Sequence, residues 1–588
     1  MPGPLIVLKF GGSVLLDERT LRLAVHEIYR WRRGGWRVVA VVSAFYGHTD
    51  QLIERARFAS DGDLAPEHAV AALLATGEST SAALLALHLR RAGVPGELFT
   101  PSTAGLRASG AALDADPVGL DVAAFERALD EQGVVVMPGF IGLDECGRVV
   151  TLGRGGSDLT ALHVAHALGG RCRLVKDVDG LYESDPAKAD PKTGERPRRY
   201  QRISFDDALR TDGSIVQHKA VRYAQQRGLD FEVGRYAGTR PTLVSKAPSV
   251  LSRRDDRPRR VRVALLGLGT VGAGVYELLS QLEHRVEIVG VCVRAATKER
   301  GLVIPAGLLS DDLDAVASCG ADIVIELIGG LTDAGRAVAG ALRSGSHVVT
   351  GNKALLAERG GELEAIADAG GLVIRGSASV GGAMPIIECV TREGGARVVH
   401  VRGVLNGTTN FVLGCVAGGL PFDEAVRQAQ QRGYAEADPS RDLSGLDAGD
   451  KLRVLARVCA GVDLADEDVV CESLTDGIKR ASREGGVPRH VASLDLRDLS
   501  QVAARVRVEA VGENDALANV PGSWNAAEVV WSDGRRQVLR GRGAGRWPTA
   551  EAVVADVLDV IRHIETEARE ADSAESEEAG VLAEVARV

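Results

Sequence analysis

Residues 261–279 read VRVALLGLGTVGAGVYELL, a short apolar run followed by glycines at positions 267, 269 and 272. This G-x-G-x-x-G spacing, between a buried strand and an amphipathic helix, is typical of a dinucleotide-binding βαβ unit, although ordinary turns also carry such glycines. Gly267 would allow the tight turn, Gly269 the approach of a pyrophosphate, and Gly272 close packing of the helix on the strand. We expect the phosphates to be bound at the helix N-terminus by Gly267, Leu268, Gly269, Thr270, Val271 and Gly272.

The strands after this motif carry two further candidates for the cofactor site. Residues 286–294, VEIVGVCVR, end in Arg294, at a place where a carboxylate would bind the ribose 2′-hydroxyl of NAD. An arginine there favours NADP(H). Residues 346–357, SHVVTGNKALLA, contain another strand, which ends near Lys353. Ligands of open α/β sheets gather at such strand ends, so Lys353 is also expected to contact the cofactor.

The composition is that of a globular chain, with 45% apolar residues and a formal net charge of −10 over 588 residues. It contains no long basic run, so nothing indicates binding to nucleic acid or to a membrane surface. No signal peptide and no apolar run of about 18 residues is evident, and we expect a cytoplasmic protein. The eight cysteines are scattered without metal-ligand spacing and are expected to be buried thiols.

Lysine is rare in this chain, since only ten of the 70 basic residues are lysine. Arginine is the default cation, so a lysine can mark a site that needs a compact ammonium or an exchangeable proton. Lys9, Lys353 and Lys451 are the candidates for such sites. Lys246 and Lys479 lie in polar stretches and are expected to have no such role.

The first 250 residues place glycine-bearing loops at strand ends, a pattern that favours phosphate binding. Residues 5–13, LIVLKFGGS, put Lys9, Gly11 and Gly12 at the end of a buried strand, where N–H groups and an ammonium can hold phosphoryl oxygens. Residues 152–158, LGRGGSD, precede an amphipathic helix and form another anion site. A strand-to-helix turn with an incidental lysine is the alternative. Cations and carboxylates clustered at strand ends fit phosphoryl transfer with Mg²⁺.

The motifs KFGGS, GES, LGRGGSD and KDVDGLYESDP, within about residues 3–246, resemble the aspartate kinase catalytic domain of the amino acid kinase family. The resemblance implies a largely parallel sheet sandwiched by helices, with MgATP and aspartate as substrates. It assigns to ATP the residues Lys9, Gly11, Gly12, Ser157, Asp177, Tyr182 and Asp185. It assigns to aspartate Ser43, Thr49, Glu78 and Arg154, and to the reacting groups Asp158 together with Lys9. From the residues alone, Glu78 is predicted at the start of a helix, as an N-terminal charge.

Residues 433–456, GYAEADPSRDLSGLDAGDKLRVLA, gather acidic side chains around a lysine. Asp447 and Lys451 are four residues apart and would share one face of a helix. They form either a surface salt bridge or a carboxylate-held ammonium that exchanges a proton with a carbonyl oxygen. Residues 539–561 set glycines, among them Gly543, ahead of a helix that we expect to return to the cofactor.

The motifs GLGTVG, TGNKALLA, SVGGAMPII, LNGTTN, GYAEADPSRDLSGLDAGDK and GRGAGRWPTA, over about residues 260–562, closely resemble the homoserine dehydrogenase family. The resemblance implies reduction of aspartate semialdehyde to homoserine with NADPH. It makes Lys353, Asp447 and Lys451 the catalytic candidates. It places Glu436, Asp442 and Asp447 on the substrate.

The resemblance also implies a site for a monovalent cation, Na⁺ or K⁺. The carbonyl groups that would bind it belong here to Val380, Gly382 and Met384. Ser377 stands where an acidic residue is common in the family, so the sequence leaves this site open.

Together the two resemblances imply an α/β protein of the bifunctional aspartokinase/homoserine dehydrogenase family, expected to be a homo-oligomer. We expect an amino acid kinase domain at 1–247, a linker at 248–259, a Rossmann domain at 260–390, an α+β substrate and dimerisation domain at 391–538, a segment returning to the Rossmann domain at 539–565 and an acidic tail at 566–588. The linker is too short for the family's regulatory ACT domains. We therefore expect the kinase not to respond to threonine or lysine.

Two residues depart from the kinase pattern at the nucleotide. Ala187 stands where an arginine is usual, and Ile215 where a lysine is usual. We expect Lys188 and Lys219 to compensate, the latter from one helical turn beyond Ile215. Two alternatives stay open: the first half is a catalytically silent binding module, or it phosphorylates another acid such as an acylated glutamate.

Overall fold

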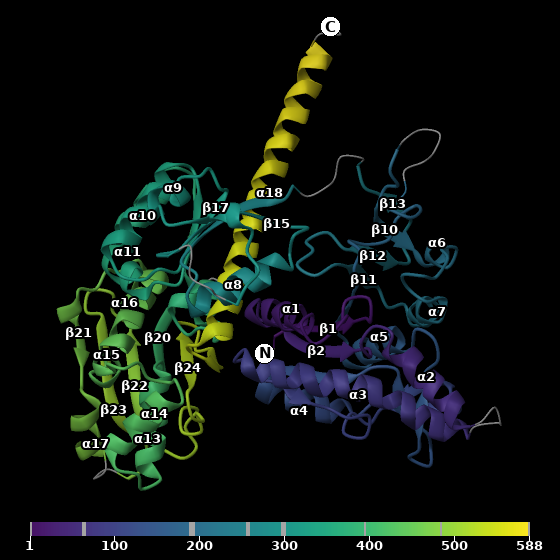
Figure 1. Cartoon of the computed structure of the whole chain (residues 1–588), viewed down its shortest axis with the longest axis horizontal. Coiled ribbons are helices and arrows are strands. Elements are labelled where there is room, and N and C mark those ends of the chain that lie inside the picture. Colours follow the sequence, from purple (N-terminus) through teal and green to yellow (C-terminus); the bar gives the residue numbers. More distant parts are fainter. Residues whose placement is uncertain are drawn as a thin grey trace. The chain divides into compact units, whose positions relative to one another are not determined.

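The computed structural model describes residues 3–60, 66–186, 188, 195–253, 259–295, 301–392, 396–481 and 485–585. The chain folds as two compact units, Met1–Arg91 with Pro95–Arg257, and Pro258–Val588 with Ala92–Val94. Both are of the α/β class that the sequence predicts (Figure 1). Ala187 lies outside the described residues.

The first unit is built on a mostly parallel sheet in the order β13-β10-β12-β11-β9-β1-β2-β6-β3. The apolar run that contains Lys9 forms an interior strand, β1, which pairs in parallel with β2 and β9. These strands are buried on both faces, as near-continuous apolar runs require. The strands are β1 Leu5–Phe10, β2 Arg37–Val42, β3 Glu97–Leu98, β6 Val134–Pro138, β9 Arg171–Val175, β10 Tyr200–Ser204, β11 Phe231–Gly234, β12 Thr242–Ser245 and β13 Val250–Leu251.

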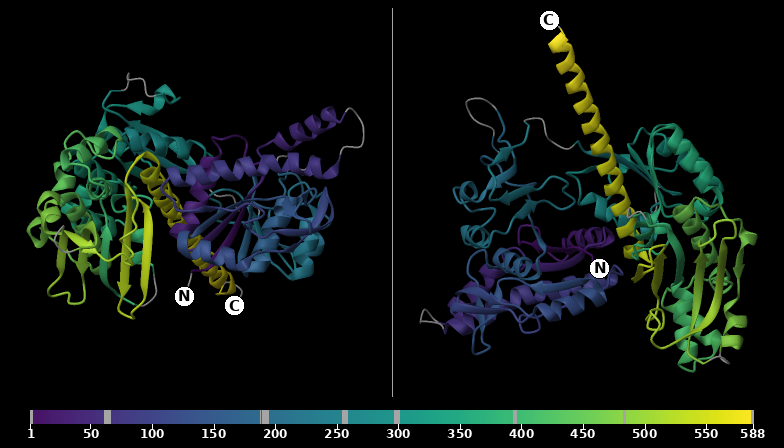
Figure 2. Two further views of the ribbon diagram at one scale, coloured as in Figure 1. Left: turned by 90° about the horizontal axis from the view of Figure 1, so that it is seen from below. Right: turned by 180° about the vertical axis from the view of Figure 1, so that it is seen from behind.

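Helices cover both faces of this sheet, with α4, α5 and α7 on one face and α1 and α3 on the other (Figure 2). A smaller sheet, in the order β5-β4-β7-β8, lies beside α5. The helices are α1 Leu21–Arg33, α2 His48–Ala59, α3 Glu67–Arg91, α4 Val122–Gln132, α5 Gly156–Leu168, α6 Phe205–Ala208 and α7 His218–Arg227. The strands of the smaller sheet are β4 Arg107–Ala111, β5 Asp114–Gly119, β7 Ile141–Leu143 and β8 Val149–Thr151.

Two boundaries in the first unit differ from the sequence-based expectation. β13 (Val250–Leu251) pairs antiparallel with β10, so the sheet continues into the range predicted as linker. Glu78 lies well inside α3 and not at the start of a helix, because the apolar helix already begins at Glu67. Its charge therefore has no helix N-terminus to stabilise it.

Among the described residues, α3 is the one helix long and apolar enough to cross a membrane. It packs against α1, α2, β6 and β8 of the first unit, with Leu74, Leu85 and Leu89 buried. This packing buries part of its apolar surface.

The second unit begins with a wholly parallel sheet in the order β16-β15-β14-β17-β18-β19. Helices α9, α10 and α11 cover one face, while α8 and α18 lie on the other (Figure 1). The strands are β14 Val261–Leu266, β15 Val286–Cys292, β16 Leu309–Ser310, β17 Ile323–Glu326, β18 His347–Thr350 and β19 Ile374–Arg375. The helices are α8 Thr270–Ser280, α9 Leu313–Ala317, α10 Thr332–Arg343 and α11 Lys353–Ala369, with short 3₁₀ turns at Ala306–Leu308 and Ser377–Ser379.

An α+β part follows, whose sheet runs in the order β21-β23-β22-β20-β24-β25 and is antiparallel except for the β21–β23 pair. Its strands are β20 Val398–Val404, β21 Val469–Cys471, β22 Val487–Asp495, β23 Ala503–Val511, β24 Trp524–Trp531 and β25 Arg536–Arg542. Its helices are α12 Ile386–Thr391, α13 Gly407–Ala417, α14 Phe422–Gln431, α15 Ser440–Leu443, α16 Leu446–Ala460 and α17 Leu474–Ala481, with a 3₁₀ turn at Asp466–Asp468.

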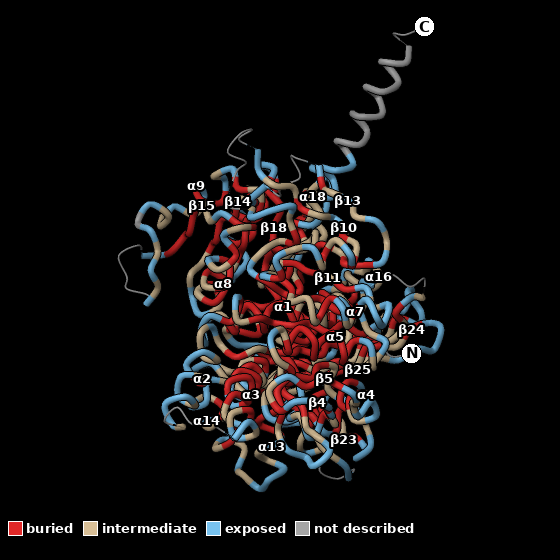
Figure 3. Tube along the Cα trace, turned by 90° about the vertical axis from the view of Figure 1, so that its right-hand side faces the viewer, coloured by how far each residue is buried: buried red, intermediate tan, exposed pale blue. Residues whose placement is uncertain are grey.

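The last helix, α18 (Arg546–Val585), carries the chain back to the dinucleotide-binding part. A Cβ on Gly274 of α8 would lie 3.1 Å from Ala550 Cβ, so the glycine permits close helix packing. Arg546 also pairs with Glu277 of α8. α18 extends through most of the acidic tail as one helix (Figure 2). Buried residues follow the central strands and the helices that pack on them (Figure 3).

Candidate functional site

Each of the three glycines in the turn after β14 meets a different steric requirement. Gly267 has φ +100°, and a Cβ there would lie 2.7 Å from the Leu327 carbonyl oxygen. A Cβ on Gly272 would lie 2.1 Å from the Gly267 carbonyl oxygen, which fixes the close approach of α8 to the turn. A Cβ on Gly269 would meet nothing within 4 Å. The backbone at Gly269 is therefore open to a ligand, as a phosphate-binding turn requires.

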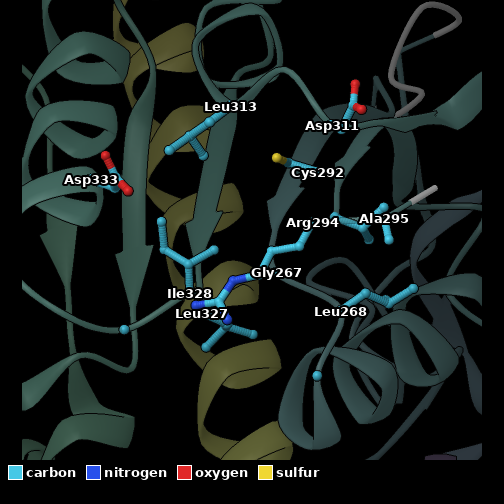
Figure 4. A pocket seen from close by; sticks show the side chains of 13 residues that line it. Gly267, Leu268, Cys292, Arg294, Ala295, Asp311, Leu313, Leu327, Ile328 and Asp333 are labelled. Carbon is cyan, nitrogen blue, oxygen red and sulfur yellow. The ribbon is translucent and has the colours of Figure 1, made fainter. Parts of the chain in front are cut away.

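A cavity of about 570 Å³ opens beside this turn, at the carboxyl ends of β14, β15 and β17. Arg294 extends into it from the end of β15, toward the side where Gly267 and Ile328 lie (Figure 4). Two carboxylates, Asp311 and Asp333, also line the cavity. The cavity thus offers a positively charged group and an open backbone for the phosphates of a dinucleotide.

Glu326 lies directly before the cavity-lining residues Leu327, Ile328 and Gly329, and the sequence analysis missed it. Its side chain is fully buried at the end of β17 and accepts hydrogen bonds from the Ile328 and Gly329 N–H groups, both at 2.9 Å. The Thr350 hydroxyl donates to its other oxygen at 2.6 Å. Glu326 therefore fixes the turn that faces the glycine motif. A carboxylate in a fully apolar strand was the available signal.

The structure brings together the three residues predicted to be catalytic in the second unit. Asp447, in the first turn of α16, pairs with Lys451 Nζ at 2.6 Å and with Lys353 Nζ at 3.1 Å. Lys353 is the first residue of α11, which Asn352 caps by accepting from the Leu355 N–H. One carboxylate thus holds an ammonium from the dinucleotide-binding part and another from the α+β part.

Asn406 links this cluster to the start of α13, and the sequence analysis includes it only within the motif LNGTTN. Its amide NH₂ donates to Asp442 at 2.7 Å and to Asp447 at 2.8 Å, while its carbonyl oxygen caps α13 by accepting from Thr409 N–H. Lys451 Nζ also donates to the Leu405 carbonyl at 2.6 Å. These bonds fix the direction of the Lys451 ammonium.

The electrostatics of the cluster follow from its burial and from the close approach of its opposite charges. Burial by itself would raise the pKa of Asp447, but the ammonium groups of Lys451 and Lys353 outweigh it and hold this pKa well below its usual range. Burial opposes the charge of Lys353, yet Asp447 prevails and raises the pKa of Lys353. Burial, with Asp447 nearby, raises the pKa of Asp442. Both charges of the Lys353–Asp447 pair therefore persist at neutral pH.

Glu436 lies apart from this cluster in its described contacts. Glu436 is exposed, and its backbone carbonyl accepts a hydrogen bond from the Gln430 side-chain amide at 3.2 Å. The structure thus joins Lys353, Asp447 and Lys451 directly. It links Asp442 to them through Asn406 and leaves Glu436 exposed.

Two glycine-bearing segments meet where α18 returns to the dinucleotide-binding part. A Cβ on Gly543 would lie 2.0 Å from Asn525 Nδ2, and a Cβ on Gly382 would lie 2.7 Å from the Arg542 carbonyl oxygen. Gly543 is therefore needed for packing at this junction. The Ser377 N–H and hydroxyl both donate to the buried carboxylate of Asp556, at 2.9 and 2.8 Å, so an acidic group from α18 does adjoin Ser377.

In the first unit, Lys9 and Asp158 form a buried ion pair of 2.7 Å. Lys9 comes from the end of β1, and Asp158 from the first turn of α5. A Cβ on Gly11 would lie 3.0 Å from Lys9 Nζ, so the glycine leaves room for the ammonium. Burial lowers the pKa of Lys9 to about 8, against the attraction of Asp158.

Glu78 reaches the same region from the middle of α3. It is buried, and burial raises its pKa to about 7 even though the Ala44 N–H donates to it and Lys9 attracts it. Ser43 follows β2 and Thr49 lies in the first turn of α2, both partly buried. Arg154 is exposed in the loop before α5.

Lys176 is a residue of this site that the sequence analysis passed over. It is buried at the end of β9, and its Nζ donates to Asp158 at 3.2 and 2.9 Å. Lys176 is the first residue of the motif KDVDGLYESDP, and the rarity of lysine in this chain was the signal that could have identified it. The neighbouring parallel strands β1 and β9 bring the two lysines to one carboxylate.

The helical relation of Lys219 to Ile215 that was expected to allow compensation is absent, whereas the compensation expected from Lys188 stays a prediction. α7 begins at His218, so Ile215 lies outside the helix, packed against the core of the unit. Lys219 Nζ binds Asp114 of the smaller sheet at 2.6 Å and the Leu152 carbonyl at 3.1 Å. Lys188 is exposed and pairs with Asp185 at 3.2 Å.

The remaining predicted ATP residues lie along the segment after β9 and at the start of α5. Asp177 and Asp185 are exposed, whereas Ser157 is buried against Gly139. Tyr182 forms a backbone bridge with Arg199. These residues are placed near strand ends, but their described contacts do not join them to the Lys9–Asp158 pair.

Comparison with known proteins matches both halves of the chain. Residues 4–233 match the model of the amino acid kinase family. Residues 267–375 match that of the homoserine dehydrogenase NAD-binding domain, and residues 385–558 that of homoserine dehydrogenase.

Individual relatives match the second half. The homoserine dehydrogenase of Synechocystis sp. is 38% identical over 317 residues, 51% of this chain and 73% of the relative. That of Neisseria gonorrhoeae is 34% identical over 322 residues, 52% of this chain and 74% of the relative. A solved homoserine dehydrogenase structure from Thiobacillus denitrificans is 36% identical, with a TM-score of 0.49, over 52% of this chain and 74% of that one.

Proposed function

Since this chain belongs to the homoserine dehydrogenase family and carries an amino acid kinase domain ahead of it, we propose that it reduces aspartate semialdehyde with NADPH and phosphorylates L-aspartate with MgATP. The dehydrogenase proposal rests on Asp447 holding the ammonium groups of Lys353 and Lys451. The direct test is to assay the purified chain for both reactions. Failure to reduce aspartate semialdehyde with either nicotinamide cofactor would overturn the first assignment.

In the dehydrogenase reaction, the nicotinamide cofactor supplies a hydride to the aldehyde carbon, and the aldehyde oxygen must take up a proton. Lys451 has two N–H bonds committed, to Leu405 and Asp447, and its third can point to that oxygen. We assign the proton transfer to Lys451. Lys353, whose side chain is 36% exposed, can meet the developing negative charge. Asp447 and Asn406 hold this arrangement.

Binding of substrate falls to the acidic residues that follow α14. The amino group of aspartate semialdehyde is a cation, which Asp442 and Glu436 can attract. Asp442 is bonded to Asn406, whereas exposed Glu436 would have to turn toward the substrate.

The dinucleotide site is proposed to use the glycine turn for the pyrophosphate. Gly269 is open, and residues Thr270 and Val271 begin α8, whose N–H groups face an anion at this end. Leu268 lines the cavity. Gly543 contributes through packing at the junction.

We expect NADPH to be preferred, because Arg294 is the cation that enters the cavity from the end of β15. The change Arg294→Asp should lower kcat/KM for NADPH about 10- to 100-fold, with less effect on NADH, since a charge-assisted phosphate contact contributes roughly 1.5–3 kcal/mol. Asp311→Asn, which removes a negative charge from the same cavity, should shift the ratio in the opposite direction. Equal kcat/KM for both cofactors in the wild type would contradict this prediction.

A monovalent cation is proposed at the loop that follows the Ser377–Ser379 turn. The carbonyls of Val380, Gly382 and Met384 would bind Na⁺ or K⁺, with Asp556 as the nearby carboxylate. The oxygen donors and the buried carboxylate suit a hard cation.

In the kinase reaction, Lys9 is proposed to contact the transferred phosphoryl group, with Gly11, Gly12 and the start of α5 around the phosphates. Glu78 is proposed to attract the aspartate amino group. A wild type that binds MgATP but forms no aspartyl phosphate would indicate a silent module. Activity with an acylated glutamate in place of aspartate would correct the substrate.

The kcat/KM of the kinase should be high only over a narrow range of pH. Glu78, with its pKa raised to about 7, is charged only above that pH, so binding of aspartate should weaken as the pH falls below about 7. Lys9, with its pKa lowered to about 8, is charged only below that pH, so kcat/KM for ATP should fall above about 8. Profiles of kcat/KM report groups of the free enzyme and provide the test. A flat profile from pH 6 to 9 would refute it.

A further inference from the structure

Asp158 holds two buried ammonium groups in the first unit. Lys9 Nζ lies 2.7 Å from one of its oxygens and Lys176 Nζ 2.9 Å from the other. The side chains of Asp158, Lys9 and Lys176 are 4%, 6% and 10% exposed. The cluster is therefore part of the interior and is only weakly screened by water.

The charges of this cluster do not balance. One carboxylate faces two ammonium groups, and the other described acid coupled to Lys9 is Glu78, whose pKa of about 7 leaves it only partly ionised at neutral pH. A buried excess charge costs free energy unless an opposite charge meets it. The cluster is thus arranged to receive an anion.

The surrounding backbone supports an anion at the same place. Lys9 Nζ lies over Gly11, at the glycine turn that follows β1. Asp158 belongs to the first turn of α5, whose N-terminal N–H groups follow Gly155 in the left-handed conformation at φ +74°. Helix N-termini and glycine turns both favour phosphate groups.

We propose that Lys176 is a second phosphoryl-binding residue of the kinase, acting beside Lys9 on the phosphoryl group in transfer. This rests on the proposed kinase function. The bond from the γ-phosphorus of MgATP to its bridging oxygen breaks, and ADP leaves with the electron pair. A carboxylate oxygen of aspartate forms the new P–O bond, and no proton needs to move. Lys9 and Lys176 would neutralise the charge on the oxygens of the phosphoryl group, while Asp158 holds both amines.

The test compares Lys176→Met and Lys176→Gln with wild type. Removing one of two ammonium groups leaves Lys9 and Asp158 as a balanced pair, so both variants should fold. Gln can still donate a hydrogen bond to Asp158 without charge. Lys246→Met, an exposed lysine of the same unit, is the matched control. Dehydrogenase activity of the same chain checks its integrity.

We expect both Lys176 variants to lower kinase kcat about 10- to 100-fold, the effect of losing a charge-assisted phosphoryl contact, and Lys246→Met to change it less than about twofold. The two Lys176 variants should also lose the preference for ATP over ADP, because the lost contact is to the γ-phosphate. Calorimetry measures this preference as the ratio of the two dissociation constants.

The kinase rate and the ATP-to-ADP ratio of dissociation constants distinguish the proposed kinase function from the proposed role of Lys176. If wild type makes no aspartyl phosphate but the Lys176 variants still lose the ATP preference, the kinase assignment fails and the phosphoryl-binding role stands. If both variants keep wild-type kcat and wild-type discrimination between ATP and ADP, the role of Lys176 is wrong.

Discussion

Replacing Lys451 or Lys353 by alanine should reduce the rate of homoserine formation at least 100-fold. A general acid or base contributes typically about 10²- to 10⁴-fold, and Asp447 holds both ammonium groups at the same point. We expect the larger loss for Lys451→Ala, because that ammonium is fixed by Leu405 and Asp447. Steady-state kcat and KM for aspartate semialdehyde at saturating NADPH are the measurement.

Two controls bear on this result. Lys479→Ala removes an exposed lysine of α17 in the same unit and should leave kcat within about twofold. Kinase activity of each variant should also be unchanged, since its site lies in the first unit. Near-normal dehydrogenase activity in both Lys451→Ala and Lys353→Ala would show that neither lysine transfers the proton.

Asp158→Asn should both abolish kinase activity and loosen the first unit. The substitution leaves Lys9 and Lys176 buried without their carboxylate, and removing one partner of a buried ion pair costs about 3–5 kcal/mol. We expect a value near the lower limit, because Lys9, with a pKa of about 8, can lose its proton. Hydrogen exchange of peptides from β1 and β9 measures this locally, without assuming that the whole chain unfolds in one step.

The surface pair of Asp130 with Arg37 provides the comparison. Asp130 is 60% exposed and 3.3 Å from Arg37, so Asp130→Asn should change stability by less than about 1 kcal/mol. Exchange in the second unit should stay as in wild type for both variants. Unaltered exchange of β1 and β9 in Asp158→Asn would mean that the carboxylate does not stabilise the two ammonium groups.

Local sequence patterns predicted the fold class and the dinucleotide turn because their causes are local. The spacing of Gly267, Gly269 and Gly272 reflects steric needs of one strand, one turn and one helix, and each need is visible in the structure. The helical spacing of Asp447 and Lys451 likewise placed both on one face of α16, with their side chains 2.6 Å apart.

The starts of helices, and the compensation expected from Lys219 for the missing lysine at Ile215, were predicted less well. Glu78 was predicted as a charge at the start of a helix, yet α3 begins at Glu67. The carboxylate can lie inside this apolar helix because the fold supplies a partner, the Ala44 N–H. Lys219 looked like a substitute for a lysine at Ile215, but α7 begins only at His218, and Lys219 binds the smaller sheet instead.

Apolar periodicity and glycine spacing act within a few neighbouring residues, so they were enough to predict the main strands and helices. Which charges share a partner depends instead on how these elements pack together. Lys176 and Lys9 meet at Asp158 because β9 lies beside β1 in the sheet, and Lys353 meets Asp447 because α11 packs against α16. Such pairings depend on strand order and helix packing, over separations in the chain that no local pattern encodes.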